Sequence, residues 1–240
     1  MVQISIPSRR SDPADPPRGY EKILGKKREI LWAASRVFRS KGLHAAGMRD
    51  IAAELGMAVG NLYYYFKDKE ELLAFVQESA LSGLLDLAAR VRALDLQVDQ
   101  KLWLLLEEHV VRLNDPDEGT PGSLAHLEVE ALGERRRTAV MAQRDEYERS
   151  VRRLIEEGMD RGVFRAMDSK VMALALLGSV NWTVKWFRPE GGKSAREIGW
   201  ETAEMLVRGL MVPGVEPTSP PPESIKAVTQ SRPSEEESKA

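Results

Sequence analysis

The chain has no cysteine among its 240 residues. It therefore offers no disulfide bridge, no thiolate metal ligand and no cysteine nucleophile. Histidine is scarce as well, with three in all. His126 and Glu130 have the spacing of one helix face, but no third ligand accompanies them, and we predict no metal site.

Long hydrophobic runs are also missing. The longest, Val171 to Val180, is too short to span a membrane, which takes about 20 residues. The first residues lack the basic start, apolar stretch and cleavage site of a secretory signal. No glycine-rich phosphate loop and no Ser–His–Asp order stands out. The sequence predicts a soluble cytoplasmic protein with no membrane partner, no cofactor and no enzymatic activity.

Charge is unevenly distributed along the chain. Residues 1–70 hold 13 Lys and Arg against 8 Asp and Glu, a net charge of +5, whereas the remainder holds 22 against 29, a net charge of −7. Neutralising DNA phosphates requires positive charge, so the first part of the chain is the candidate for contact with DNA.

Residues 48–69 have the layout of a helix-turn-helix, in which a glycine separates two short helices. Gly56 lets the backbone leave the first helix. Apolar residues recur at helical spacing on both sides of it, at Ile51, Ala52, Leu55, Val59, Leu62 and Phe66. The second helix of such a motif enters the major groove of DNA.

The second helix leaves polar and aromatic side chains facing outward. Asn61 can bond base edges or phosphates, and tyrosine hydroxyls at 64 and 65 can reach phosphates. Gly60 costs about 1 kcal/mol relative to alanine inside a helix, a cost that is tolerated where DNA must approach closely. Lys69, at the start of the next helix, suits a phosphate. The alternative is that Tyr63, Tyr64 and Tyr65 pack between helices.

Residues 26–72 resemble the DNA-binding domain of the TetR family of transcriptional regulators. The matching segments are Ile30 to Phe38 with Gly42, Arg49 to Ala52, Gly60 to Phe66 and Lys69 to Leu72. The resemblance implies an all-helical homodimer whose first three helices bind a palindromic operator and whose larger C-terminal domain binds a small ligand. The chain departs from the family at Met48, Ala58 and Val59, where Thr, Ser and Lys or Arg are common. Spacing and resemblance together give the predicted DNA contacts, which are Arg49, Ala58, Val59, Gly60, Asn61, Tyr63, Tyr64, Tyr65 and Lys69.

Helical periodicity without strand alternation predicts an all-α fold. We expect a disordered arm at 1–19, a helix-turn-helix DNA-binding domain at 20–67, a ligand-binding and dimerisation domain at 68–212 and a disordered tail at 213–240. Beyond the motif, helices are expected at 21–41, 69–93, 98–114, 123–132, 135–161, 169–187 and 195–211.

Residues 171–180 are apolar on nearly every side, which predicts a helix buried all round. The TetR resemblance implies that this helix and the last one pair with their twofold mates in a dimer. Packing inside one monomer is the alternative, and periodicity does not separate the two.

The segment from Asn181 to Pro189 combines aromatic and basic side chains. Trp182 and Trp186 share a helix face, and Lys185 and Arg188 lie beside them. Such a surface suits a flat or apolar ligand with anionic groups. The alternative is that the tryptophans pack in a core and the cations stabilise a helix C-terminus.

Three segments, 144–148, 158–164 and 181–189, look like one TetR subgroup that represses fatty-acid or steroid degradation genes and is released by acyl-CoA thioesters. The subgroup usually has Arg where Lys185 stands. This resemblance implies a repressor released by a fatty or polycyclic acyl-CoA. The predicted ligand contacts are Tyr147, Asn181, Trp182, Lys185, Trp186 and Arg188. Two alternatives stay open. One is a drug- or aromatic-responsive regulator of an efflux gene, and the other is a helical interaction protein without DNA binding.

Overall fold

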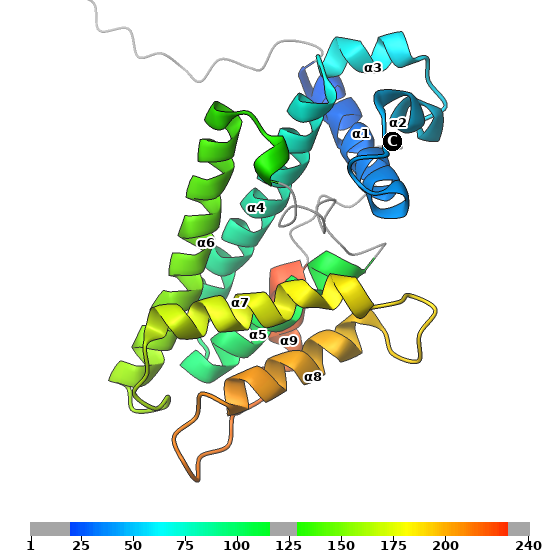
Figure 1. Cartoon of the computed structure of the whole chain (residues 1–240). Coiled ribbons are helices and arrows are strands. Elements are labelled where there is room, and N and C mark those ends of the chain that lie inside the picture. The colour runs from blue at the N-terminus through cyan, green and yellow to red at the C-terminus, as the bar shows by residue number, and fades with distance from the viewer. Residues whose placement is uncertain (1–19, 116–128, 230–240) are drawn as a thin grey trace, which may run out of the picture.

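A computed structural model describes residues 20–115 and 129–229, and these residues confirm the all-α prediction (Figure 1). Within them the one extended pairing is an isolated bridge between Phe164 and Met211. The helices are α1 (Tyr20–Lys41), α2 (Met48–Glu54), α3 (Val59–Tyr65), α4 (Lys69–Ala93), α5 (Val98–Asn114), α6 (Glu134–Asp160), α7 (Ser169–Trp186), α8 (Ala195–Arg208) and α9 (Pro222–Thr229), with a 3-10 turn, η1, at Val129–Ala131.

Helices α1, α2 and α3 form a small head around one hydrophobic cluster, to which the start of α4 also contributes. Ile30, Phe38, Ile51 and Leu62 are completely buried there. Because these side chains of α1, α2 and α3 share one cluster with Leu72 and Leu73 of α4, the head is held in a fixed orientation against the first turns of α4.

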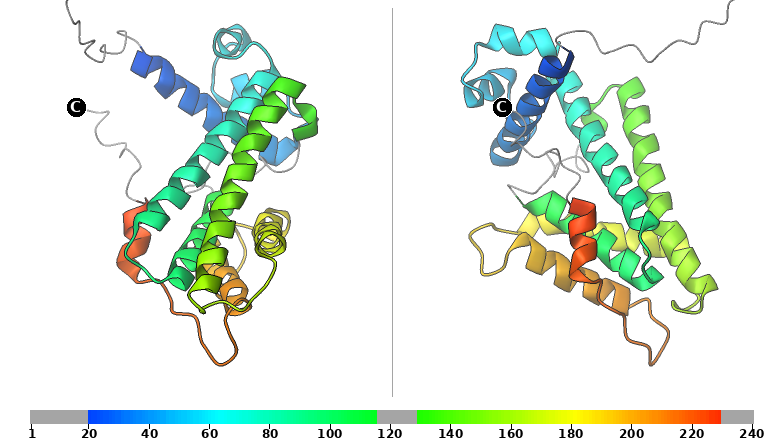
Figure 2. Two further views of the ribbon diagram at one scale, coloured as in Figure 1. Left: turned by 90° about the vertical axis from the view of Figure 1, so that its left-hand side faces the viewer. Right: turned by 180° about the vertical axis from the view of Figure 1, so that it is seen from behind.

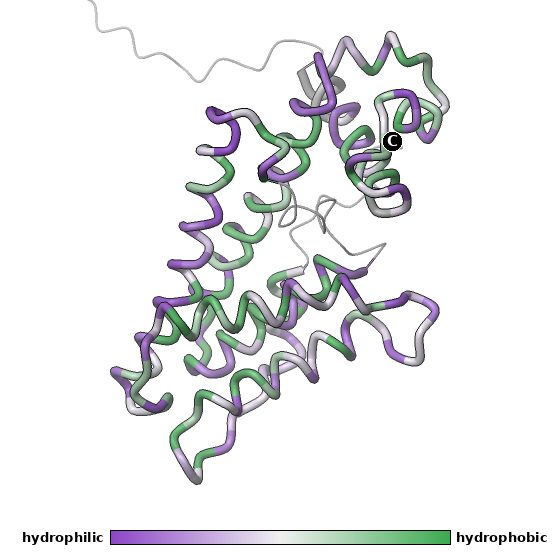
Figure 3. Tube along the Cα trace, viewed as in Figure 1, coloured by the Kyte–Doolittle hydropathy of each residue, from purple (hydrophilic) through white to green (hydrophobic). Residues whose placement is uncertain are grey.

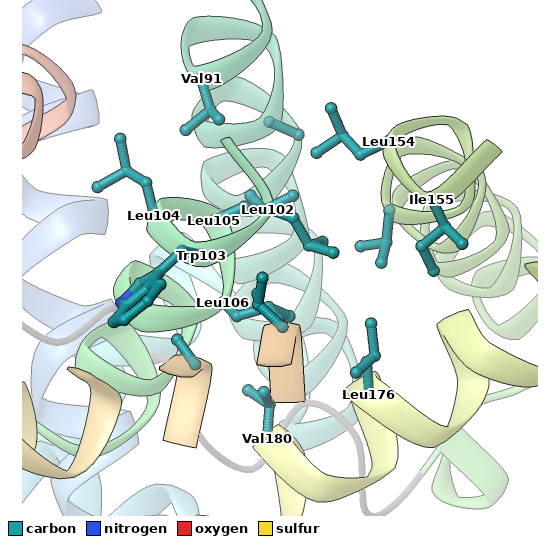
Figure 4. Packing of buried hydrophobic residues seen from close by; sticks show 14 of the residues in the cluster. Val91, Leu102, Trp103, Leu104, Leu105, Leu106, Leu154, Ile155, Leu176 and Val180 are labelled. Carbon is teal, nitrogen blue, oxygen red and sulfur yellow. The ribbon is translucent and has the colours of Figure 1, made fainter. Parts of the chain in front are cut away.

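The body of the protein is built around α5, which packs against α4, α6, α7 and α8 (Figure 1). Every residue from 102 to 111 is buried, so this helix has no solvent-facing side over three turns. Figure 4 shows its leucines meeting Val91 of α4, Ile155 of α6 and Val180 of α7. Trp103 stacks on Trp200 of α8 with ring centroids 4.8 Å apart.

Helix α4 connects the head to the body. Asp68 caps its N-terminus by accepting a hydrogen bond from the amide of Glu71 at 2.7 Å. Its side chains belong to both hydrophobic clusters, and it runs beside α6 in each view of Figures 1 and 2. Among the described helices α4 alone is long and apolar enough to cross a membrane, but 56% of that stretch is buried inside the protein, as expected of a core helix.

The prediction of a disordered tail from 213 onward is wrong for residues 222–229, which form α9 against α4 (Figure 2). Pro222 begins the helix, a position where its missing N–H costs nothing. Val228 is fully buried, and Asp99 accepts a hydrogen bond from the amide of Thr218 at 2.8 Å. Apolar side chains three residues apart (225 and 228) were the overlooked signal.

Helix α7 is not buried all round, so that prediction is also wrong for the single chain. It contacts α5 and α6 through Ala173, Leu176 and Val180, and nothing in the described chain covers its opposite side. Val171 and Leu174 are each 54% exposed there. Figure 3 shows α7 hydrophobic along much of its length, whereas α6 alternates hydrophobic and polar residues.

The predicted bounds of the other helices agree with the structure to within a few residues. The helix predicted at 123–132 falls largely outside the described residues, and its last part is the 3-10 turn η1. The predicted arm at 1–19 and the end of the tail also lie outside the described residues.

Candidate DNA interface and effector cavity

The turn between α2 and α3 has the geometry that its glycine predicts. Gly56 has a φ of 62°, in the left-handed region that favours glycine. Leu62 and Phe66 anchor α3 in the head and are almost completely buried. Since these two side chains point inward, the opposite side of α3 is turned to solvent.

The outward side of α3 carries most of the predicted DNA contacts. Tyr64 is 77% exposed and Tyr63 is 50% exposed, so neither packs between helices as the alternative required. Tyr65 is half-buried, with its ring edge-on to Tyr64 at 5.1 Å. Asn61 is exposed, and a Cβ added at Gly60 would meet no atom within 4 Å. The fold itself therefore gives no reason for this glycine.

Three more predicted contacts lie around α3. Arg49, on α2, and Ala58, which precedes α3, are exposed, and Val59 is half-buried. Ala58 and Val59 occupy positions where the TetR resemblance leads us to expect polar side chains. Both positions reach the surface, but the side chains here are apolar. Backbone groups, Asn61 and the tyrosines are left as the polar groups of α3.

Lys69 differs from its predicted role. Its ammonium donates to the main-chain carbonyl oxygen of Leu43 and to that of His44, the latter at 3.4 Å. These bonds tie the first residue of α4 to the loop between α1 and α2. The structure therefore gives Lys69 a positioning role within the head, and a phosphate contact stays a prediction.

Salt bridges that the sequence analysis missed brace α2 against α1. Lys41 donates to Asp50 at 2.6 Å, and Arg36 donates to Glu54 at 2.7 Å. Asp50 also accepts a hydrogen bond from the amide of Gly47. The Lys41 hydrogen bond, helped by that of Gly47, lowers the pKa of Asp50 below its usual value, so this carboxylate stays charged at neutral pH.

A cavity of about 500 Å³ lies in the body, between α4, α5, α6 and α7. Most of its buried lining residues are apolar, and exposed residues of α6 and α7, among them Met141 and Leu174, form its mouth. The lining residues are Ala80, Leu81, Leu84, His109, Arg112, Leu113, Met141, Arg144, Asp145, Tyr147, Glu148, Lys170, Leu174, Leu177, Gly178 and Asn181. A volume of this size suits a small organic ligand.

Buried polar groups line one wall of the cavity. The hydroxyl of Tyr147 lies 3.1 Å from Nδ1 of His109, and both side chains are buried. Burial raises the pKa of Tyr147, so its phenol stays neutral. Arg112 donates to the carbonyl oxygen of Gly83 at 3.0 Å, which ties α5 to α4 beside the cavity.

Two further cations line the cavity, and neither is among the predicted ligand contacts. Lys170 is exposed at the mouth. Arg144 is partly buried, and its Nη2 atom is buried without a hydrogen-bond partner among the described residues. Burial lowers the pKa of Arg144, and the nearby charge of Glu130 opposes that shift. No periodic pattern marks such a residue, because its distinguishing property is burial.

The predicted ligand residues divide into two groups. Tyr147 and Asn181 line the cavity, whereas Trp182, Lys185, Trp186 and Arg188 do not. Trp182 is 63% exposed and Trp186 is 48% exposed, so the tryptophans do not pack in the monomer core either. In the described residues, no group of three or more His, Asp or Glu side chains is placed to hold a metal ion, and His126 lies outside them.

Comparison with known proteins covers both parts of the chain. Residues 30–76 match the model of the bacterial regulatory proteins of the TetR family, and residues 95–210 match the tetracyclin repressor-like C-terminal domain. The chain is 27% identical over 207 residues to the HTH-type transcriptional repressor KstR2 of Mycobacterium tuberculosis, covering 81% of this chain and 97% of that protein.

Solved structures agree with these matches. The TetR family regulator PfmR from Thermus thermophilus is 29% identical, covers 76% of this chain and 99% of its own, and has a TM-score of 0.66. AibR, crystallised in complex with isovaleryl coenzyme A and operator DNA, has the same fold with a TM-score of 0.67, at 23% identity over 76% of this chain and 98% of its own. With a helix-turn-helix head, a cavity-bearing helical body and both family domains matched, the chain belongs to the TetR family of transcriptional regulators.

Proposed function

We propose that this protein is a cytoplasmic, homodimeric transcriptional repressor without enzymatic activity. It binds a palindromic operator and is released by a small hydrophobic effector, a fatty or polycyclic acyl-CoA. The observation that carries this function is the position of α4, which begins directly behind α3 and then forms a wall of the cavity. In the dimer, two α3 helices enter successive major grooves about 34 Å apart.

Helix α4 supplies the mechanical link between effector and DNA. At its first turn, Lys69 holds the loop between α1 and α2. Three to four turns later, Leu81 and Leu84 line the cavity. A ligand that displaces this part of α4 moves the head at its other end, and the two heads leave the spacing that the operator requires. Effector and DNA then weaken each other's binding by the same factor.

The cavity supports an acyl-CoA as the effector class. Its leucines suit an acyl chain or ring system, and the exposed cation Lys170 suits the oxygens of a thioester or phosphate. About 500 Å³ is enough for the acyl portion and too small for a whole CoA thioester, so the nucleotide would lie outside the mouth. KstR2 is a repressor, and AibR was crystallised with both isovaleryl coenzyme A and operator DNA.

The exposed side of α7 supports homodimerisation. Val171, Leu174, Gly178, Trp182 and Trp186 recur at intervals of three or four residues and form one exposed stripe, here called the α7 stripe. A Cβ at Gly178 would meet nothing within 4 Å, which leaves room for a second helix to approach. A stripe of this kind is costly in water and typical of a helix that packs against its twofold mate.

Operator binding and release test this function together. Fluorescence anisotropy of labelled DNA from upstream of the protein's own gene should rise on titration with the full-length protein, and the affinity should fall steeply with salt. A panel of CoA thioesters, with a panel of aromatic drugs as the control, should then return the anisotropy to that of free DNA for at least one thioester. Binding that responds only to the drugs would instead favour the efflux-regulator alternative.

A further inference from the structure

We propose that the effector carries a carboxylate at the end of its acyl portion, and that Arg144 of α6 and Gln77 of α4 bind this group inside the protein. The inference rests on the proposed function for the acyl-CoA class, which makes the effector the monothioester of a dicarboxylic acid. It deepens that function by stating which acyl groups the cavity selects.

Arg144 supplies the positive charge of the proposed carboxylate site. Its Nη2 atom is buried beside an apolar cavity and donates no hydrogen bond within the described structure. Two acidic residues also line the cavity: Asp145 is exposed, and Glu148 is largely buried, with its Oε1 atom 3.9 Å from Nε of Arg152 and without a hydrogen bond in the described residues. The charge of Glu130 lies near this guanidinium, but the buried Nη2 atom makes no hydrogen bond, and an anionic ligand would satisfy it.

Gln77, on α4, is a second buried polar side chain without a hydrogen bond. It is 0% exposed, and neither its amide nitrogen nor its amide oxygen has a hydrogen-bond partner among the described residues. It lies one turn before Leu81 and two turns before Leu84, which line the cavity, so Gln77 stands on the same face of α4 just beyond the lining residues. A completely buried glutamine with both polar atoms unsatisfied is rare in folded proteins.

The pairing of α4 with α6 places these two residues within about one helical turn of each other along the helix pair. Glu70 accepts hydrogen bonds from the amide of Gly133 at 3.0 Å and lies 3.0 Å from the guanidinium of Arg136, which sets the register of two helices running in the same direction. Seven residues further along α4 stands Gln77, and eleven further along α6 stands Arg144. Both side chains tilt toward the N-termini of their helices, and the longer arginine can span the remaining offset toward Gln77.

A carboxylate satisfies this arrangement better than an uncharged group. The arginine fork matches the two carboxylate oxygens, and the glutamine amide donates to one of them. A methyl-ended chain would leave both polar side chains buried and unsatisfied. Because Gln77 belongs to α4, a carboxylate bound there would also pull directly on the helix that positions the DNA-reading head.

The test compares two CoA thioesters of equal chain length, decanoyl-CoA and its ω-carboxyl counterpart sebacyl-CoA, by calorimetric titration of the full-length protein without DNA. Sebacyl-CoA should bind about 10- to 100-fold more tightly, the ratio expected of one charged hydrogen bond. Arg144→Met should abolish this preference and Gln77→Leu should reduce it. Arg149→Met, on the same helix but paired with Glu146 outside the cavity, is the matched control and should leave it unchanged. Circular dichroism verifies that each variant is folded.

Equal affinity for the two thioesters, or a preference for sebacyl-CoA that survives Arg144→Met, would overturn the proposal. Free decanoate and sebacate form a second arm. If only the free sebacate binds, in an Arg144-dependent manner, the carboxylate site stands and the CoA part of the proposed function fails. If no probe binds, the carboxylate site is refuted, while operator binding by the same preparation independently decides whether the protein is a repressor.

Discussion

Glu107 makes the stability of this protein depend on pH in an unusual direction. It lies on α5 with no exposed surface, and Arg196 of α8 donates to Glu107 at 3.1 Å and to Glu108 at 2.8 Å. One guanidinium thus faces two buried carboxylates. Burial raises the pKa of Glu107 from 4.5 to about 7, the repulsion of Glu108 adds to this rise, and Arg196 opposes it.

The sign of the effect follows from where the proton is bound. Between pH 4.5 and 7 the folded protein keeps the Glu107 proton, whereas the unfolded chain releases it. The unfolded state therefore binds fewer protons, and the free energy of unfolding falls as pH rises through this window. The loss contributed by Glu107 reaches about 3 kcal/mol above pH 7, at about 1.4 kcal/mol for each pKa unit.

Urea unfolding monitored by circular dichroism, at fixed protein concentration and at pH values from 5 to 8, measures this loss. Glu107→Gln should remove most of the decline, because glutamine stays neutral in both states. Glu201→Gln, an exposed partner of Lys193, is the control and should leave the decline in place. A wild type and a Glu107→Gln variant whose stabilities fall in parallel across the window would refute the reasoning.

Three further substitutions test other parts of the structure. Tyr64→Ala should weaken operator binding by about tenfold, the effect of one lost phosphate contact, without changing the dimer; unchanged anisotropy titrations would remove Tyr64 from the DNA interface. Trp182→Ser should convert the proposed dimer to a folded monomer, because each copy would lose about 2 kcal/mol or more of interface burial; a dimer in analytical ultracentrifugation would exclude this tryptophan from the interface. Gly158→Ala should destabilise the protein by about 1–3 kcal/mol, since the new Cβ would lie 2.0 Å from the Phe164 ring. The control is Gly192→Ala, whose new Cβ would have no atom of the described residues within 4 Å. Equal melting temperatures for the two variants would contradict the packing described.

The fold could be predicted from the sequence because its signals are local. Apolar residues at helical spacing, the turn glycine at 56 and the cap at Asp68 mark the helices within a few residues. The exposure of the α7 stripe could not be predicted, because an apolar helix has the same pattern whether its own chain or a second copy covers it. Residues 222–229 were missed because proline and glutamate around them outweighed two apolar positions.

The two candidate sites also differ in how far the sequence could predict them. Most of the candidate DNA interface lies on consecutive residues of α3, so helical spacing was enough to predict Asn61 and Tyr64 as contacts. The cavity is assembled from four helices far apart in the sequence. Gln77 and Arg144 resemble any polar residue on a charged helix until burial singles them out, and the conspicuous tryptophans drew attention to the exposed end of α7 instead.

The central claim is that effector and operator oppose each other through α4, and a reciprocal binding measurement tests it most directly. The affinity of the releasing thioester is measured with and without saturating operator DNA, and the affinity of the operator is measured with and without saturating thioester. We predict that the two ratios are equal and well above one. A thioester that binds equally well to the free protein and to the operator complex would contradict the account.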